Sequence, residues 1–301
     1  MEFEVLETLW FGDFSDEEAE QEAQHSLAAR IGQIHGLLPF PATARRLLAA
    51  IQEPDYAVGR VATIIEADAA LTTRILRLVN SAAYGLKARC TTIPHALTLL
   101  GAKTIGEIGM AVVMLEMFQD ETGAGQQIQT HLLTVAALSR ILAVHCGHPT
   151  DDVYTCGLLH DIGKLLLLQV ERQRYHEVLV SLPRERDSAH LREREEFHYD
   201  HAVLGAHVLD AWKIPDPVPT VVAWHHQMAR AHRAGGRHAV LAALVRVADH
   251  LSYEIGNLDD KPATAALVKD ESAAYIGLTE ENLAGMWDDL ATTHMQCTTS
   301  P

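Results

Sequence analysis

Apolar residues recur along most of this chain at the spacing of amphipathic helices. Leu47, Leu48 and Ile51 stand one to four positions apart, and residues 69–80 repeat a similar spacing. This spacing collects apolar side chains on one face of a helix. We find no convincing two-residue alternation of the kind that marks a half-buried strand, and no repeat of fixed period. The pattern therefore predicts an all-α protein.

The predicted helices form two groups. The first group starts at residue 42 and continues with 58–66, 69–80, 93–100 and 105–118. Asp68 is expected to cap the helix over 69–80, and the last two helices are divided near Gly101. The second group covers residues 129–145, 151–169, 172–181, 187–196, 200–212, 216–228, 238–255 and 279–290. A polar, glycine-rich link over 120–127 separates the groups, so we expect two packed helical lobes.

Four segments follow from this grouping. Residues 1–26 are strongly acidic and are expected to form a peripheral helix or tail, whereas 27–119 form the N-terminal lobe. Residues 120–291 form the second lobe, and 292–301 are expected to be a flexible tail. The first lobe holds no cluster of acid, base or nucleophile candidates, so we expect it to scaffold the second. Within it, Asn80 and Ser81 are expected to end one helix and cap its neighbour.

The composition indicates a globular, cytoplasmic protein. Hydrophobic residues make up 48% of the 301 residues, and the formal net charge is -16. This charge argues against a broad nucleic-acid or anionic-membrane surface. The first residues show no secretory signal, and no stretch has the roughly 18 uninterrupted apolar residues of a membrane helix. The four cysteines form no CxxC pair and are expected to be reduced.

The adjacent pair His160 and Asp161 stands within the apolar run 156–166. Burying this pair is costly unless a partner compensates for the lost water, and a divalent metal would do so. Neutral imidazole and carboxylate are suitable ligands for such a metal. Taken alone, the pair is better explained as a helix-end aspartate with a chance histidine neighbour. The remainder of the chain favours the metal.

Further ligand-type residues follow at long intervals: His131, His201, His225, His226 and Asp249. With the pair His160 and Asp161 included, the successive positions are separated by 29, 40, 24 and 23 residues. These intervals are long enough for helices to return and for side chains to converge inside a bundle. Asp249 lies on an apolar stripe, where an unpaired carboxylate would be penalised.

Simpler interpretations remain open for these histidines. His131 could be a satisfied core histidine, and His201 could simply begin a helix. His225 and His226 lie about 100° apart on a helix, so only one of them need face the site. The remaining histidines considered are expected at the surface: His145, His148, His176, His190, His198, His207, His232 and His238.

With these residues in view, residues 30–255 resemble the HD superfamily of metal-dependent phosphohydrolases, and more closely its HDOD branch. In the first lobe the resemblance rests on residues 37–41, 68–72, 76–85, 93–97 and 99–101. In the second lobe it rests on residues 157–164, 200–205, 212–215 and 224–226. The segment Asn80-Ser-Ala-Ala-Tyr-Gly85 is the part typical of the HDOD branch.

The resemblance implies an all-α fold with an HD-like second lobe and a regulatory output role in bacterial signal transduction. The branch is generally regarded as lacking established catalysis, yet this chain keeps a candidate at every ligand position. The related HD-GYP phosphodiesterases carry a Gly-Tyr-Pro element after their paired histidines. Here His225 and His226 are followed by Gln227 and Met228, so cyclic-dinucleotide hydrolysis of that type is not supported.

Two functions follow from these expectations. We favour a regulatory module that contacts an unknown signalling protein and holds a metal-type site or a small phosphate-containing ligand. The alternative is a metal-dependent phosphohydrolase acting on phosphomonoesters or phosphodiesters. In both, one or two ions of Fe, Mn, Ni or Zn are expected.

The alternative assigns specific roles. His160, Asp161 and Asp249 would hold a metal that activates a water, and His131 would complete its shell. His201 with His225 or His226 would hold a second metal or polarise the phosphate. Lys164 lies about one turn beyond His160 and Asp161, which we call the HD pair. It would stabilise phosphate charge, unless it is simply a solvated helix lysine.

Overall fold

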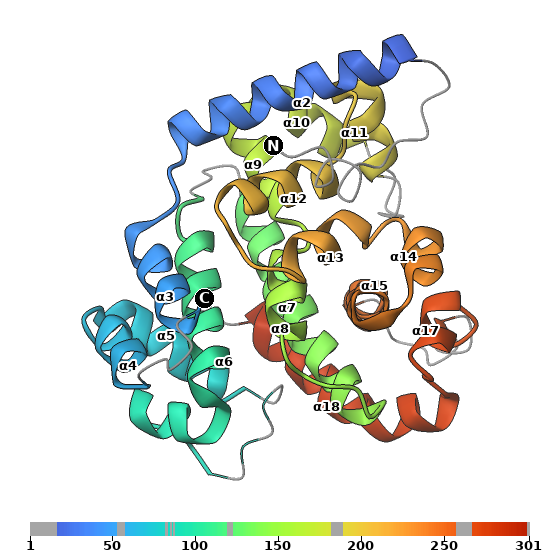
Figure 1. Ribbon diagram of the computed structural model, residues 1–301. Helices are drawn as coiled ribbons and strands as arrows, with labels where there is room; N and C mark the ends of the chain where they lie inside the picture. Colours follow the sequence, from blue (N-terminus) through green and yellow to red (C-terminus); the bar gives the residue numbers. More distant parts are fainter. Residues whose placement is uncertain are drawn as a thin grey trace. The chain divides into compact units, whose positions relative to one another are not determined.

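The computed structural model describes residues 17–52, 58–81, 84, 86, 88–118, 123–181, 189–256 and 267–299. Within these ranges the secondary structure consists of helices, with no strand (Figure 1). The all-α prediction is therefore confirmed for the part of the chain that the structure describes. The expectation for residues 1–16 lies outside it.

The helices follow the sequence pattern closely. The first helices are α2 (Glu17–Leu37), α3 (Ala42–Gln52), α4 (Val58–Glu66), α5 (Ala69–Val79) and α6 (Ile93–Leu115). Then come α7 (Ala124–His145), α8 (Val153–Leu159), α9 (Ile162–Val170), α10 (Arg172–Ser181), α11 (Ala189–Phe197) and α12 (His201–Ala211). The last are α13 (Val218–Trp224), α14 (Met228–Ala234), α15 (Gly236–Gly256), α17 (Glu271–Tyr275) and α18 (Glu280–Thr299).

The chain divides into two compact units, each assembled from three stretches of sequence. Unit 1 takes the described residues of Met1–Pro39, Phe118–Ile128 and Leu159–Ala242. Unit 2 takes those of Phe40–Met117, Gln129–Leu158 and Ala243–Pro301. These boundaries differ from the two continuous lobes expected at residue 120, because helices distant in sequence bury their apolar faces together.

In unit 2, α3, α4 and α5 pack on α6. Asp68 caps α5 as expected, since its carboxylate accepts hydrogen bonds from the backbone of Ala70 and Leu71. Gly101 interrupts α6 with a φ of 81°, which confirms the predicted division near this residue. α6 is long and apolar enough to cross a membrane, but most of it is buried against the other helices of this unit.

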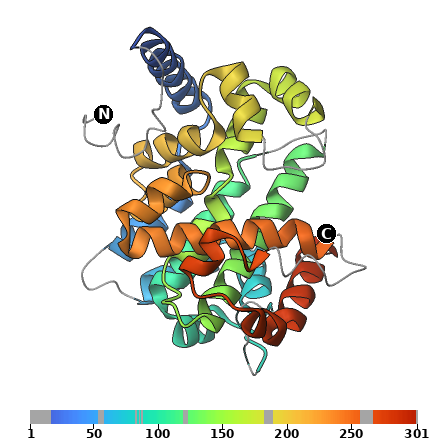
Figure 2. The ribbon, with the colours of Figure 1, turned by 90° about the vertical axis from the view of Figure 1, so that its right-hand side faces the viewer.

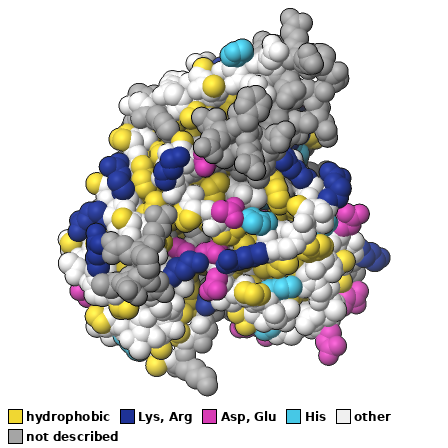
Figure 3. All heavy atoms as spheres, viewed as in Figure 1, with side chains coloured by type: hydrophobic (Ala, Val, Ile, Leu, Met, Phe, Trp, Pro, Cys, Tyr) yellow, Lys and Arg dark blue, Asp and Glu magenta, His cyan; other side chains and the backbone are white. Residues whose placement is uncertain are grey.

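Charge is unevenly distributed along the acidic chain. Residues 40–117 of unit 2 carry eight lysines and arginines against six aspartates and glutamates. Figure 3 shows basic side chains on the face that α3 to α5 contribute to. The net acidity therefore resides outside this stretch.

In unit 1, α12 packs against α9 and α13, and α2 packs against α9 and α12 (Figures 1 and 2). Two glycines permit the close approach of α9 and α12. A Cβ on Gly163 would lie 2.7 Å from the carbonyl carbon of His201 and would collide with its oxygen. A Cβ on Gly205 would lie 3.2 Å from the backbone nitrogen of Gly163. This contact brings the start of α9 against the start of α12.

The helix α2 joins unit 1 through both apolar and polar contacts. Its buried residues recur at helical spacing: Ala23, Leu27, Ile31 and Ile34. Arg30 pairs with Glu171 and donates a hydrogen bond to the Tyr199 hydroxyl at 3.2 Å. The helix is thus an integral layer of the unit.

Three expectations need correction. The predicted helix 151–169 breaks at His160 and Asp161, and the predicted helix 216–228 ends at Trp224. The C-terminal segment from residue 292 continues α18 to Thr299 instead of forming a tail. Its helix persists because the buried positions Leu283, Met286 and Leu290 are followed by the fully buried Thr293 on the same stripe.

The segment that begins at Asn80 also differs in detail. Asn80 ends α5, as expected, but its amide binds the loop before α6: it donates to the Cys90 carbonyl at 2.7 Å and accepts from the Cys90 nitrogen at 2.7 Å. Ser81 donates back to Leu78. The residue that caps α6 is Thr92, so the expectation that Asn80 or Ser81 caps the neighbouring helix is wrong.

Candidate metal centre

The HD pair lies in the break between α8 and α9. Asp161 occupies the N-cap position of α9 with φ -105° and ψ 16°, yet its carboxylate makes no capping hydrogen bond. Asp68 and Asp200, at equivalent positions, each cap their helices. Asp161 thus stands at a helix end, as the simpler interpretation has it, but its carboxylate is directed to partners other than the backbone of α9.

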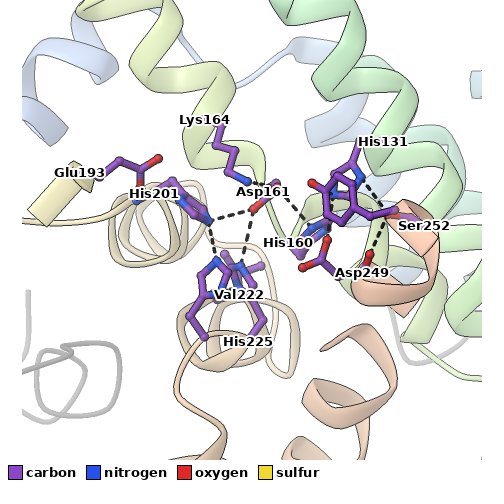
Figure 4. Close-up of polar contacts among 12 residues, drawn as sticks. His131, His160, Asp161, Lys164, Glu193, His201, Val222, His225, Asp249 and Ser252 are labelled. Carbon is purple, nitrogen blue, oxygen red and sulfur yellow. Dashed lines mark hydrogen bonds and ion pairs between the residues drawn. The ribbon is translucent and has the colours of Figure 1, made fainter. Parts of the chain in front are cut away.

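Those partners include the preceding His160 and two histidines from the regions of α12 and α13 (Figure 4). The Nε2 atom of His201, at the start of α12, lies 2.9 Å from Asp161 Oδ1. The Nε2 atom of His225, just after α13, lies 3.5 Å from the same oxygen. His160 Nε2 lies 3.4 Å from Asp161 Oδ2, and His226 Nε2 lies 3.0 Å from His201 Nε2.

This geometry fits a metal ion. One ligand atom each from Asp161, His201, His225 and His226 lies within 4.8 Å of the other three. Metal bonds of about 2.0–2.2 Å place ligand atoms roughly 3–4 Å apart around one ion. Both members of the adjacent histidine pair belong to this cluster.

Neighbouring groups fix how the histidines present their nitrogens. His201 Nδ1 bonds Glu193 Oε2 at 2.5 Å, and His225 Nδ1 bonds the Val222 carbonyl at 2.6 Å. Since carboxylate and carbonyl oxygens accept, each Nδ1 carries the hydrogen; this assignment is inferred from the partners. The Nε2 atoms therefore face Asp161 and are the available ligand atoms. Such outer hydrogen bonds orient metal-binding histidines.

Glu193 is a site residue that the sequence reasoning missed. It is fully buried on α11 and accepts further hydrogen bonds from the Tyr175 hydroxyl at 2.7 Å and the His201 backbone nitrogen at 2.8 Å. A signal was present: Glu193 stands four residues from both Ala189 and Phe197, which form the buried face of α11. An acidic residue on such a face needs partners.

The surroundings of the centre favour a negatively charged Asp161 and a positively charged His201. Burial alone would lower the pKa of His201, but the Glu193 and Asp161 carboxylates raise it to about 9. Burial would raise the pKa of Asp161, but His160, Lys164 and His201 hold it well below its usual range. Burial, together with His225 and His201, holds the pKa of His226 well below its usual range. Asp161 is thus a carboxylate and His226 a neutral imidazole at neutral pH.

Lys164 lies at the centre and not in bulk water. Its Nζ donates to Asp161 Oδ2 at 2.5 Å, and its side chain is 13% exposed. The contact arises because Lys164, in the first turn of α9, stands three residues after Asp161. Its action on a phosphate stays a prediction.

His131 and Asp249 pair with each other inside unit 2. His131 Nε2 lies 3.1 Å from Asp249 Oδ1, Ser252 Oγ lies 3.2 Å from His131 Nδ1, and the Tyr253 ring stacks on the imidazole (Figure 4). Asp249 is thus paired, as expected for a carboxylate on an apolar stripe. That these two residues share a metal shell with Asp161 stays a sequence-based prediction.

Two of the histidines expected at the surface are elsewhere. His207 is fully buried, because every position of α12 from His201 to Leu209 is covered. His190 stacks on His226 with ring centroids 4.4 Å apart. Sequence spacing could not identify either position, since both depend on packing between helices distant in the chain.

Comparison with solved structures supports the architecture. A proposed phosphohydrolase from Shewanella amazonensis SB2B superposes with a TM-score of 0.70 at 23% identity, over 89% of this chain and 98% of that one. An HDOD domain protein of unknown function from Geobacter sulfurreducens gives 0.70 at 19% identity, over 92% and 99%. A proposed signal transduction protein from Marinobacter aquaeolei VT8 gives 0.66 at 19% identity, over 97% and 67%. These likenesses show the fold.

Sequence comparisons identify the family. An uncharacterised protein from Treponema pallidum is 28% identical over 212 residues, 68% of this chain and 40% of that protein. Ribonuclease Y from Acetivibrio thermocellus is 26% identical over 141 residues, 47% of this chain and 21% of that protein. The chain thus spans less than half the length of these relatives. The HDOD domain model matches residues 37–228, nearly two thirds of the sequence, and the chain therefore belongs to the HDOD family.

Proposed function

We propose that this chain is a regulatory HDOD module whose unit 1 binds a divalent transition metal through Asp161, His201, His225 and His226. The observation that carries the proposal is the convergence of these four ligand atoms within 4.8 Å. One carboxylate and three imidazoles suit Fe, Mn, Ni or Zn. Family membership and the likeness to a proposed signal transduction protein support the regulatory part.

The regulatory role would rest on coupling metal occupancy to the stability of unit 1. The ligands come from the start of α9, the start of α12 and the end of α13. A metal bound by the native state alone stabilises that state by mass action. Metal occupancy would therefore set the stability of the arrangement of these helices. A signalling protein that contacts unit 1 would bind the metal-loaded and metal-free forms with different affinity.

Metal analysis of protein purified without a histidine tag tests the proposal. We expect at least half an equivalent of transition metal in the wild type and less than a tenth in Asp161→Asn and His201→Ala. His176→Ala, which removes an exposed histidine, is the matched control and should keep its metal. Absence of metal from the wild type after supplementation would contradict the proposal.

Phosphoester hydrolysis is the second candidate, and the position of Lys164 favours it. When bound, the metal would lower the pKa of a coordinated water and supply a hydroxide near neutral pH. Lys164, already ion-paired with Asp161, would offer its ammonium group to a phosphate oxygen. Asp161 and the Glu193–His201 pair would hold the ligand geometry.

A hydrolysis panel separates the two candidates. Wild type, His160→Ala, Asp161→Ala and Lys164→Met are assayed on phosphomonoesters, nucleotides and cyclic dinucleotides with the identified metal. Metal-dependent turnover that disappears in the first two variants would promote the enzyme over the regulatory module. Equal background rates in all four proteins would support the regulatory module.

A further inference from the structure

A second polar cluster lies in unit 2. It consists of Tyr84, from the segment typical of the HDOD branch, Arg140 on α7 and Tyr154 on α8. The rings of Tyr84 and Tyr154 have centroids 5.6 Å apart, and the Arg140 guanidinium lies 4.5 Å from the centroid of Tyr84. Neither the proposed metal function nor the scaffolding expectation accounts for this cluster.

Three polar atoms of the cluster are buried without partners. Tyr84 is 8% exposed and Tyr154 is 4% exposed. Both hydroxyls and Arg140 Nε are buried, and in the described chain none of these three atoms has a hydrogen-bond partner. A buried polar group without a partner costs roughly 1–3 kcal/mol, so three together need an explanation.

The charges nearby leave Arg140 available. Two acidic residues of the region, Glu107 and Asp152, share Lys103: its Nζ lies 3.0 Å from Asp152 Oδ1 and 3.7 Å from Glu107 Oε1. Burial, the largest effect, raises the pKa of both tyrosines, so both hydroxyls keep their hydrogens. The cluster therefore combines one positive charge with O–H and N–H donors.

Hydrogen bonds among the described residues near Tyr84 help to position it. Asn80 bonds both backbone groups of Cys90, and the Tyr84 nitrogen donates to the Ser81 carbonyl at 3.2 Å.

We propose that Arg140, Tyr84 and Tyr154 form a binding site for a small oxyanion, a phosphate or carboxylate group. The Nε edge of a guanidinium presents two parallel N–H donors that match two oxygens of such a group. The two hydroxyls supply further donors, and donors with one net positive charge complement an anion better than a neutral ligand. The site stands independently of the proposed metal function, because it uses no residue of the Asp161 cluster.

Thermal unfolding of metal-free, EDTA-treated protein tests this site. Sodium phosphate and sodium acetate are titrated separately against sodium chloride at constant ionic strength. If the site binds its anion, Tm rises with the logarithm of the anion concentration, by about two degrees or more at 100 times Kd. Comparison of the two arms identifies whether phosphate or carboxylate is preferred.

Variants locate the effect. Arg140→Gln and the double variant Tyr84→Phe/Tyr154→Phe should lose the anion-dependent rise, whereas Asp161→Asn should keep it, which separates this site from the metal centre. Without the anion, the double variant should unfold at or above the wild-type Tm, since it removes only unpartnered hydroxyls. No anion-specific rise in the wild type, or an equal rise in all variants, would overturn the proposal. A lowered Tm of the double variant without anion would also overturn it, because the hydroxyls would then be satisfied by water.

Discussion

Glu193 Oε2 holds His201 at two points, through Nδ1 of the imidazole at 2.5 Å and through the backbone nitrogen at 2.8 Å. The same carboxylate thus orients both the side chain and the start of α12. The orientation of a candidate ligand and the beginning of its helix depend on one buried acid.

The first prediction concerns this acid. Glu193→Gln keeps the size of the side chain but weakens its hold on His201 Nδ1, so the apparent metal affinity should fall about 10- to 100-fold. A competition titration with a chromophoric chelator measures it. Glu195→Gln, on the exposed face of α11, is the control and should bind as the wild type does. Equal affinities for all three proteins would remove Glu193 from the centre.

Metal loading should release a proton. In the metal-free protein the pKa of His201 is about 9, so below that pH both of its nitrogens carry hydrogens. A metal must displace the hydrogen on Nε2, and the logarithm of the affinity should therefore rise by about one per pH unit between pH 7 and 9. Calorimetry in buffers of different ionisation enthalpy counts the protons released. Affinity that is independent of pH over this range would contradict the prediction.

Gly163→Ala should destabilise the protein by several kcal/mol. Its Cβ would collide with the backbone of His201, which cannot move without disturbing the contact between α9 and α12. Gly285→Ala is the matched control: nothing lies within 4 Å of its Cβ, and alanine favours a helix interior by up to about 1 kcal/mol. Urea unfolding measures both. Equal effects of the two substitutions would mean that the contact is not tight.

Unit 2 should lose stability as the pH rises through neutrality. Burial and, next, Asp152 raise the pKa of Glu107 from 4.5 to about 8. Between these values the native state holds a proton that the unfolded state has released, so the free energy of unfolding falls as pH rises, by up to a few kcal/mol in total. Glu107→Gln should flatten this slope, whereas the exposed Glu66→Gln should not. Unfolding at pH 5, 6.5 and 8 checks this, and parallel slopes for wild type and Glu107→Gln would refute it.

Local periodicity identified most of the long helices and several ligand candidates, but it missed α14 and α17. Asp161, His201, His225 and His226 were identified because their residue types are costly on apolar faces, and the structure brings them together. Glu193 was missed because its role depends on α11 packing beside the start of α12, a contact that spacing along one helix does not encode. The surface expectation for His207 was wrong for the same reason: α12 is covered all round.

The helix α2 lies before residue 37, where the match to the HDOD domain begins, yet Leu27, Ile31 and Ile34 are buried in unit 1 and Arg30 pairs with Glu171. A protein shortened to the matched residues would expose the apolar sides of α9 and α12, the two helices whose starts carry Asp161 and His201. The smallest fragment suited to metal measurements is therefore longer than the family domain, and it begins at or before Glu17.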